Sequence, residues 1–234
     1  MRNQIHQCSK CSEFLKYTEE SFYYFGLLRD KLYTDDTYYS EKKPFLRCSY
    51  CYTILDSDKT LKDRKPFLTI VRKGENIQYK NELQKSIGVK AIELNLVENY
   101  GILGKYNLSS EQEKSVRIQI LLLENNKRRD LYDGNFEVPY NEMEIANLLK
   151  LEKLLTLEDG KFLVVEIKRY LGQFAKAKEQ LDLLCDVLNY NNRTRFFKDK
   201  IEKENELIEF EDRYVSKFEI NDDTKKSLYR GIKY

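Results

Sequence analysis

Two pairs of cysteines near the start of the chain constrain its fold more than any other feature of the sequence. Cys8 and Cys11 form one CxxC pair, Cys48 and Cys51 form a second, and 36 residues separate the pairs. A tight turn can bring both thiolates of one pair onto a single ion, and two such turns complete a tetrahedral shell of four sulfurs. We therefore expect Cys8, Cys11, Cys48 and Cys51 to hold one structural Zn²⁺. Four thiolates close that shell and leave no position for a substrate water.

The first 60 residues carry few helix signals and many aromatic residues. Short β segments separated by turns, at Gly26 and at residues 34–36 (TDD), fit this composition. We predict a zinc ribbon over residues 1–60, with a metal knuckle at the end of each of two hairpins, in which the metal replaces the core that so short a segment lacks. The aromatic side chains fit either a small ribbon core, which we favour, or a surface on which bases stack.

Charge decides between these two readings of the aromatic residues. Residues 1–60 contain nine basic and nine acidic side chains, and four thiolates with one Zn²⁺ add a further −2. The whole chain has 41 lysines and arginines against 39 aspartates and glutamates, a net charge of +2. A nucleic-acid-binding ribbon is normally basic, so a zinc-ribbon regulator that binds nucleic acid is an alternative but is not favoured.

No apolar run approaches the roughly 18 residues of a membrane span, and the start of the chain leads into no signal-peptide core. We expect no membrane association. Four of the five cysteines stand in CxxC pairs, which fits metal ligation in the reducing cytosol better than disulfides. The expected location is therefore cytoplasmic.

A connector and a helical domain are predicted after the ribbon. The connector is predicted at residues 61–77. Residues 59–75 are locally basic around a short β-prone run at 67–71 (FLTIV), which Pro66 and Gly74 flank. From about residue 79 the apolar period becomes 3.6, so we assign residues 78–234 to a mainly α domain. The first stripe predicts a helix that ends near Gly101 and Gly104, and its apolar members are Leu83, Ile87, Ala91 and Leu94.

Later helices are marked by caps. Ser110 with Glu113, and Asn141 with Glu144, have the spacing of capping boxes. Inward-facing residues at helical spacing follow each box: Val116, Ile120 and Leu123 after the first, and Leu148, Leu151 and Leu155 after the second. The charged residues from 193 to 214 predict a final amphipathic helix, read as a solvated outer face.

A helical hairpin is predicted around Gly172. Residues 161–171 are apolar nearly all round, and Gly172 stands where a C′ glycine ends a helix. The next apolar stripe at helical spacing contains Phe174, Ala177, Leu181, Leu184, Cys185 and Leu188. Cys185 is thus expected in the core, and with His6 as the chain's one histidine most triad arrangements are absent.

Residues 162–168 suggest a different hypothesis, in which the chain is an enzyme. Residues 162–168 (FLVVEIK) follow an Asp-Gly turn and resemble the core strand of the PD-(D/E)xK nucleases. On a strand, Glu166 and Lys168 share one face, where the resemblance implies that Glu166 holds Mg²⁺ and Lys168 polarises water or phosphate. Residues 141–144 (NEME) resemble the upstream acidic motif, with Glu144 in place of the usual aspartate. Whether residues 161–171 are helix or strand therefore discriminates the two hypotheses.

A second resemblance spans nearly the whole chain. Residues 21–26 (SFYYFG), 32–36 (LYTDD) and 44–51 (PFLRCSYC) resemble a family of uncharacterised bacterial proteins that open with a CxxC…CxxC zinc ribbon. Residues 116–120 (VRIQI) and 125–129 (NNKRR) are similar to that family's helical region, and residues 167–177 (IKRYLGQFAKA) to its closing hairpin. Asp36 stands where the family has glycine, and its proline-rich stretch is reduced to Pro44.

This resemblance implies a metal and a fold but no activity. The family's closing signature is a tetratricopeptide-like hairpin, in which Leu171 and Phe174 pack across the Gly172 bend and Ala177 allows close helix approach. We accordingly expect a small β zinc ribbon followed by a mainly α domain. The predicted function is a zinc-stabilised protein-interaction or adaptor protein without catalytic activity, whose partner is another protein. The alternatives are the Mg²⁺-dependent nuclease built on Glu144, Glu166 and Lys168, and the nucleic-acid-binding regulator.

Overall fold

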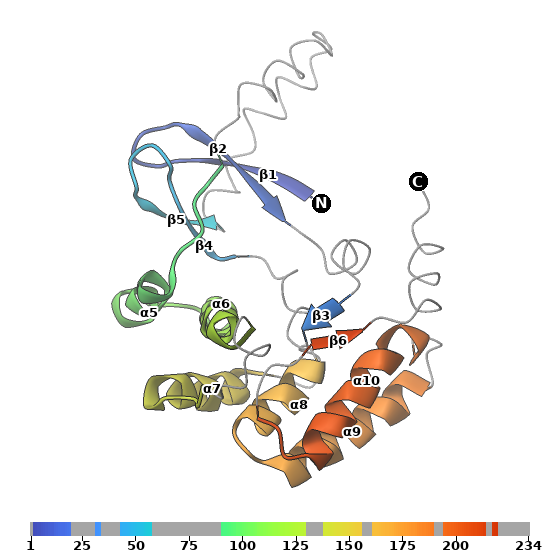
Figure 1. Cartoon of the computed structure of the whole chain (residues 1–234). Helices are drawn as coiled ribbons and strands as arrows, with labels where there is room; N and C mark the ends of the chain where they lie inside the picture. The colour runs from blue at the N-terminus through green and yellow to red at the C-terminus, as the bar shows by residue number, and fades with distance from the viewer. Residues whose placement is uncertain are drawn as a thin grey trace. The chain divides into compact units, whose positions relative to one another are not determined.

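The computed structural model describes eight stretches of the chain: residues 2–19, 31–33, 43–57, 90–129, 138–155, 161–189, 194–213 and 217–219. They form two compact units, and Figure 1 labels their helices and strands. Unit 1 comprises Met1–Glu19 and Glu41–Leu108, and unit 2 comprises Glu20–Ser40 and Ser109–Tyr234. The fold is mainly helical, with small β-sheets before the helices, as the sequence predicted.

Unit 1 is built on two β-hairpins. Strands β1 (Arg2–Gln7) and β2 (Phe14–Glu19) pair antiparallel, from Arg2 opposite Glu19 to Gln7 opposite Phe14. Strands β4 (Phe45–Arg47) and β5 (Ile54–Asp56) pair in the same way, and an isolated bridge joins Arg47 of β4 to Ile92. Each hairpin encloses one CxxC pair in its turn, so the predicted knuckles at hairpin ends are confirmed.

The helix of unit 1 starts later than its sequence pattern suggested. Helix α5 spans Leu96–Lys105 and begins at a capping box of Asn95 with Glu98. Residues 90–95 are bridge and coil, so the predicted helix through Ala91 and Leu94 is wrong there. Helix α5 ends at Lys105, directly after Gly104, so the predicted helix end near the two glycines is confirmed, and Gly101 lies inside the helix.

Five helices and a two-stranded sheet are described in unit 2. The helices are α6 (Ser110–Arg129), α7 (Glu142–Leu154), α8 (Lys161–Tyr170), α9 (Phe174–Asn189) and α10 (Thr194–Glu209). The sheet pairs β3 (Lys31–Tyr33) with β6 (Lys217–Glu219), which lie far apart in the sequence. Helix α7 packs against α6 and α8, and α9 packs between α8 and α10 (Figure 1).

Helix α8 is the central helix of this core because it buries both of its sides. Leu163, Ile167 and Tyr170 join a cluster with residues of α6 and α7, including Leu148 and Leu151. Phe162 and Val165 of the same helix join a second cluster with Ala177, Leu181 and Leu184 of α9 and Ile208 of α10. This explains why residues 161–171 read as apolar nearly all round. Leu171 packs against the first cluster and Phe174 against the second, and their packing on each other across the bend stays a prediction.

Helix ends follow local sequence signals closely. The box of Asn141 with Glu144 is present at α7, as predicted. At α6 the box lies one residue earlier than predicted: the Ser109 hydroxyl accepts from the Gln112 amide, and the Gln112 side chain accepts from the Ser109 amide. Gly172 has a φ of +72°, and the amides of Gly172 and Gln173 donate to the carbonyls of Arg169 and Lys168. This is a Schellman motif, and it confirms Gly172 as the C′ residue.

The charged tail is not the solvated face that its composition predicted. Lys200 and Glu204 of α10 are buried, and so are Leu207 and Ile208. The prediction failed because two charged residues of this helix, Lys200 and Glu204, point inward to Glu166 and Arg169 of α8. Composition alone cannot separate such residues from those of a solvated face.

Several predictions concern parts of the chain outside the described residues. They are the connector at 61–77 with its strand, the start of the helix near residue 79, the turns at Gly26 and 34–36, and the aromatic run at 22–25. The domain limits of 1–60, 61–77 and 78–234 therefore stay predictions. Among the helices of the described stretches, none is long and apolar enough to cross a membrane.

Candidate metal centre

The two CxxC turns have the same backbone hydrogen bonds. In the first, the Cys8 amide donates to the Glu13 carbonyl and the Ser12 amide donates to the Cys8 carbonyl, both at 2.9 Å. In the second, the amides of Cys48 and Tyr52 donate to the Thr53 and Cys48 carbonyls, also at 2.9 Å. Each turn thus closes on its own first cysteine, which fixes the two thiols of a pair on the same side of the loop.

A left-handed residue completes each knuckle. Ser12 has a φ of +62° and Tyr52 a φ of +59°, and each directly follows the second cysteine of its pair. Glycine adopts this conformation without the steric cost that a Cβ brings, yet neither position is glycine. The two knuckles are therefore alike in backbone and differ in the side chains they present.

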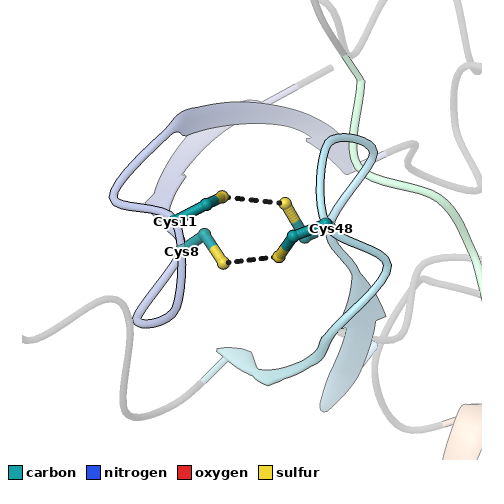
Figure 2. A group of neighbouring side chains, drawn as sticks. Cys8, Cys11 and Cys48 are labelled. Atoms are coloured by element: carbon teal, nitrogen blue, oxygen red, sulfur yellow. Dashed lines mark hydrogen bonds between the residues drawn. The ribbon is translucent and has the colours of Figure 1, made fainter.

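The two knuckles face each other and bring all four sulfurs together (Figure 2). The four Sγ atoms lie within 4.8 Å of one another. Cys8 Sγ is 3.5 Å from Cys51 Sγ, and Cys11 Sγ is 3.6 Å from Cys48 Sγ. Four sulfurs at about 2.3 Å from one tetrahedral ion lie about 3.8 Å apart, so the spacing fits a single ion between the knuckles.

Burial of the cysteines alternates within each pair. Cys8 and Cys48 are buried, whereas Cys11 and Cys51 are partly exposed. Leu15 and Leu55, one from each hairpin, are buried against the cysteines. The site is therefore enclosed on its inner side by the small core of unit 1 and reaches solvent through one cysteine of each pair.

Four thiols this close cannot all ionise without a cation between them. Hydrogen bonds from the Thr53 side chain and amide lower the pKa of the Cys51 thiol to about 6. Although the Glu13 amide lowers the pKa of Cys11, burial and the neighbouring sulfurs raise it to about 12. A divalent ion would compensate the repulsion among the thiolates, which is how metal binding releases protons from such a site. The Tyr50 amide, 3.4 Å from Cys48 Sγ, is placed to donate to that sulfur.

The donor set limits the chemistry of the centre. Four thiolates in tetrahedral geometry suit Zn²⁺ or iron, and not the oxygen-seeking Mg²⁺ or Ca²⁺. All four expected ligands are in place, so the residues fit the metal that the sequence predicted. A shell with four protein ligands would have no open position, which is typical of structural metal sites.

The three residues of the nuclease alternative lie on helices and in three different ion pairs. Residues 161–170 form α8, not the strand that this alternative requires. Glu144 is bonded to Arg128 at 3.0 Å, and Lys168 to Glu152 at 2.9 Å. Lys200 Nζ lies 2.6 Å from Glu166 Oε1. Glu166 and Lys168 are two residues apart, or about 200° around a helix axis, so they do not share one face.

A buried charged cluster between α8 and α10 was missed by the sequence analysis. Glu166, Arg169, Lys200 and Glu204 are each at most 2% exposed. Arg169 Nε donates to Glu204 Oε2 at 3.0 Å, and the Tyr170 hydroxyl donates to Glu166 at 2.9 Å. Burial raises the pKa of Glu166 to about 7 despite the nearby Lys200 ammonium. One signal in the sequence could have indicated this cluster. Glu166 and Arg169 are three residues apart and Lys200 and Glu204 are four apart, and residues at these spacings share a helix face.

His6 and Cys185 were the two other residues considered for catalysis. The backbone of His6 lies in β1 opposite Leu15. Cys185 lies in α9, packed at the edge of the second core cluster, and burial raises the pKa of its thiol. The prediction that Cys185 is a packing residue is therefore confirmed.

Comparison of the chain with protein-family models, with curated proteins and with solved structures finds no match. The resemblance to the bacterial ribbon family and the tetratricopeptide-like character of the α8–α9 hairpin stay predictions. The described residues define a mainly helical protein with four clustered cysteines, on two β-hairpins, that could hold a metal ion.

Proposed function

We propose that this chain is a zinc-stabilised protein-interaction protein of the cytoplasm, in which Zn²⁺ on Cys8, Cys11, Cys48 and Cys51 holds a binding surface in shape. The ion has a structural role, and the partner is another protein. No catalytic step is assigned to the chain.

The closeness of the four sulfurs is the observation that carries the proposal. A closed thiolate shell supplies folding free energy to a segment whose hairpins are short, and it offers no site for substrate. Zinc is favoured over iron because it has no redox chemistry and serves this purpose in small domains. A preorganised turn also loses little entropy when it binds, which suits a recognition surface.

Two further observations favour interaction over phosphodiester cleavage. The carboxylates of Glu144 and Glu166 each lie against a cation of the protein, Arg128 and Lys200, where a metal ion would have to displace it. Glu166 is moreover fully buried, so no phosphodiester reaches it without opening of the core. A nucleic-acid partner is less favoured since the net charge is only +2.

Affinity purification of the tagged full-length protein from its native host tests the proposal. Wild type and Cys185→Ser should retain the same partner protein at near-stoichiometric amounts, and Cys48→Ser should lose it together with the metal. The purified protein should not hydrolyse DNA or RNA with Mg²⁺ or Mn²⁺. Absence of a partner, or cleavage that Glu166→Ala abolishes in a folded protein, would refute the proposal.

A further inference from the structure

Each cysteine of the metal centre has a close sulfur neighbour in the opposite knuckle. Cys8 Sγ lies 3.5 Å from Cys51 Sγ, and Cys11 Sγ lies 3.6 Å from Cys48 Sγ, as the dashed lines of Figure 2 show. A disulfide bond is about 2 Å long, so a small movement of the side chains is enough to join either pair. The four thiols are therefore arranged for oxidation as well as for metal binding.

Each of these two pairs combines a partly exposed cysteine with a buried one. Cys11 and Cys51 are partly exposed, whereas Cys48 and Cys8, their neighbours across the site, are 0% and 1% exposed. A dissolved oxidant therefore reaches one sulfur of each pair first, and the other sulfur lies behind it in the core. Redox-sensitive cysteines often have this arrangement, in which an accessible thiolate lies next to a resolving cysteine.

A small apolar core holds the two knuckles opposite each other in addition to the ion. Leu15 of β2 and Leu55 of β5 are 0% and 2% exposed, and they pack with the cysteines in one cluster. Because one leucine comes from each hairpin, this contact does not depend on the metal. The sulfurs of opposite knuckles thus stay within reach of one another when the ion leaves.

A disulfide within a CxxC pair fits the turns less well. Two backbone hydrogen bonds and a left-handed residue, Ser12 or Tyr52, fix each turn in the shape that directs its sulfurs toward the opposite knuckle (Figure 2). Drawing two sulfurs of one turn together would distort that backbone, and a strained disulfide is more easily reduced and exchanged. Since all four sulfurs lie within 4.8 Å of one another, exchange can convert a strained pairing into an unstrained one.

We propose that peroxides convert the four-cysteine site into two disulfides between the knuckles, with release of the ion. The bonds join Cys8 to Cys51 and Cys11 to Cys48. This inference rests on the proposed zinc site and adds a response to oxidants. The partly exposed thiolate of a pair attacks a peroxide oxygen, the O–O bond breaks, and a sulfenic acid and hydroxide form. The buried thiolate then attacks the sulfenic sulfur, and the S–O bond breaks with loss of a second hydroxide. Each sulfur has lost one electron, and the peroxide has accepted both.

These disulfides join the same two hairpins that the ion joins. The bonded cysteines are 43 and 37 positions apart, so each bond closes a long loop and restrains the unfolded chain. A bond within a CxxC pair would close a loop of a few residues and leave the hairpins unconnected. A sulfur in a disulfide is no longer a thiolate ligand, which is why the ion leaves. Dithiothreitol with fresh Zn²⁺ should restore the metal site.

Peptide mapping of the oxidised full-length protein tests the pairing. The sequence has a cleavage site inside each CxxC pair, because trypsin cuts after Lys10 and chymotrypsin after Tyr50. Zinc-loaded Cys185→Ser, which lacks the thiol outside the site, is treated with two equivalents of hydrogen peroxide, one for each disulfide. It is then alkylated, digested without reduction and analysed by mass spectrometry. A chromogenic chelator should detect the release of one zinc per chain, and the linked peptides should show the two bonds between the knuckles.

Trapping of the sulfenic acid tests which sulfur of each pair reacts first. With peroxide below one equivalent and dimedone present, the adducts should form mainly on Cys11 and Cys51, the partly exposed cysteines. Adducts mainly on Cys8 or Cys48 would contradict the proposed order of attack.

Four cysteines allow three pairings, and the other two would overturn the proposal. These are bonds within the CxxC pairs, and bonds of Cys8 with Cys48 and of Cys11 with Cys51. Retention of zinc after oxidation, or sulfinic and sulfonic acids in place of disulfides, would overturn it too. The zinc site is tested separately, by the metal content before peroxide is added. A protein without zinc that still forms the two bonds between the knuckles would refute the zinc and support the pairing.

Discussion

Removing one partner of the buried Arg169–Glu204 ion pair should destabilise unit 2 strongly. Neither side chain is exposed, and Arg169 also donates to the Asp212 carbonyl at 2.8 Å. Arg169→Leu leaves the Glu204 carboxylate in the core without its guanidinium, and deletions of this kind cost about 3–5 kcal/mol. Glu204→Leu leaves the guanidinium buried without its carboxylate and should cost a similar amount.

The double variant separates the penalty of an unpaired charge from the worth of the pair. With both residues replaced by leucine no charge of this pair remains in the core, so most of the desolvation penalty disappears. A cost of about 1–3 kcal/mol should remain, because the Asp212 carbonyl loses a buried donor. The double variant should thus be more stable than either single variant.

Urea unfolding followed by far-ultraviolet circular dichroism measures these free energies. Asp182→Asn is the control, since its pair with Lys178 is exposed and should contribute less than about 1 kcal/mol. Single variants that cost under about 1 kcal/mol, or a double variant whose cost equals the sum of the two singles, would refute the assignment of a buried, coupled pair.

Two other sites make testable predictions. Burial raises the pKa of Glu166 from 4.5 to about 7, so the stability that its neutral form contributes is present below pH 4.5 and lost as the pH rises through 7. At about 1.4 kcal/mol per pH unit, the unfolding free energy of wild type should fall by about 3 kcal/mol over this window because of Glu166. Glu166→Gln has no carboxyl group to titrate and should not show this fall. If denaturant titrations give the same dependence of unfolding free energy on pH for both proteins, the prediction is wrong. Gly172→Val should lower the unfolding free energy by more than about 1 kcal/mol because of the positive φ, whereas Glu211→Gly, at a φ of +55°, should raise it by about 0.5 kcal/mol; equal midpoints in urea for both variants and wild type would refute both effects.

The features that the sequence predicted correctly depend on short stretches of chain. A CxxC turn, the capping box of Asn141 with Glu144 and the C′ position of Gly172 are each decided within six residues by hydrogen bonds and φ preferences. The meeting of the two knuckles was also predictable, although 36 residues separate them, because one tetrahedral ion needs four ligands.

The features that the sequence did not predict depend on contacts between distant segments. Glu166 and Lys200 are 34 positions apart, and each alone looks like an ordinary exposed charge of a helix. Only the packing of α8 beside α10 shows that both point inward. The bridge between Arg47 and Ile92, which keeps residues 90–92 extended, similarly overrides their helical spacing.

Metal analysis of the purified protein tests the central claim most directly. Native mass spectrometry with elemental analysis should find one Zn²⁺ per chain in wild type and in Cys185→Ser, whose cysteine lies outside the four-sulfur site. Cys48→Ser should lose most of that zinc, since it removes a buried ligand. Iron in place of zinc, no metal at all, or full zinc occupancy in Cys48→Ser would contradict the account.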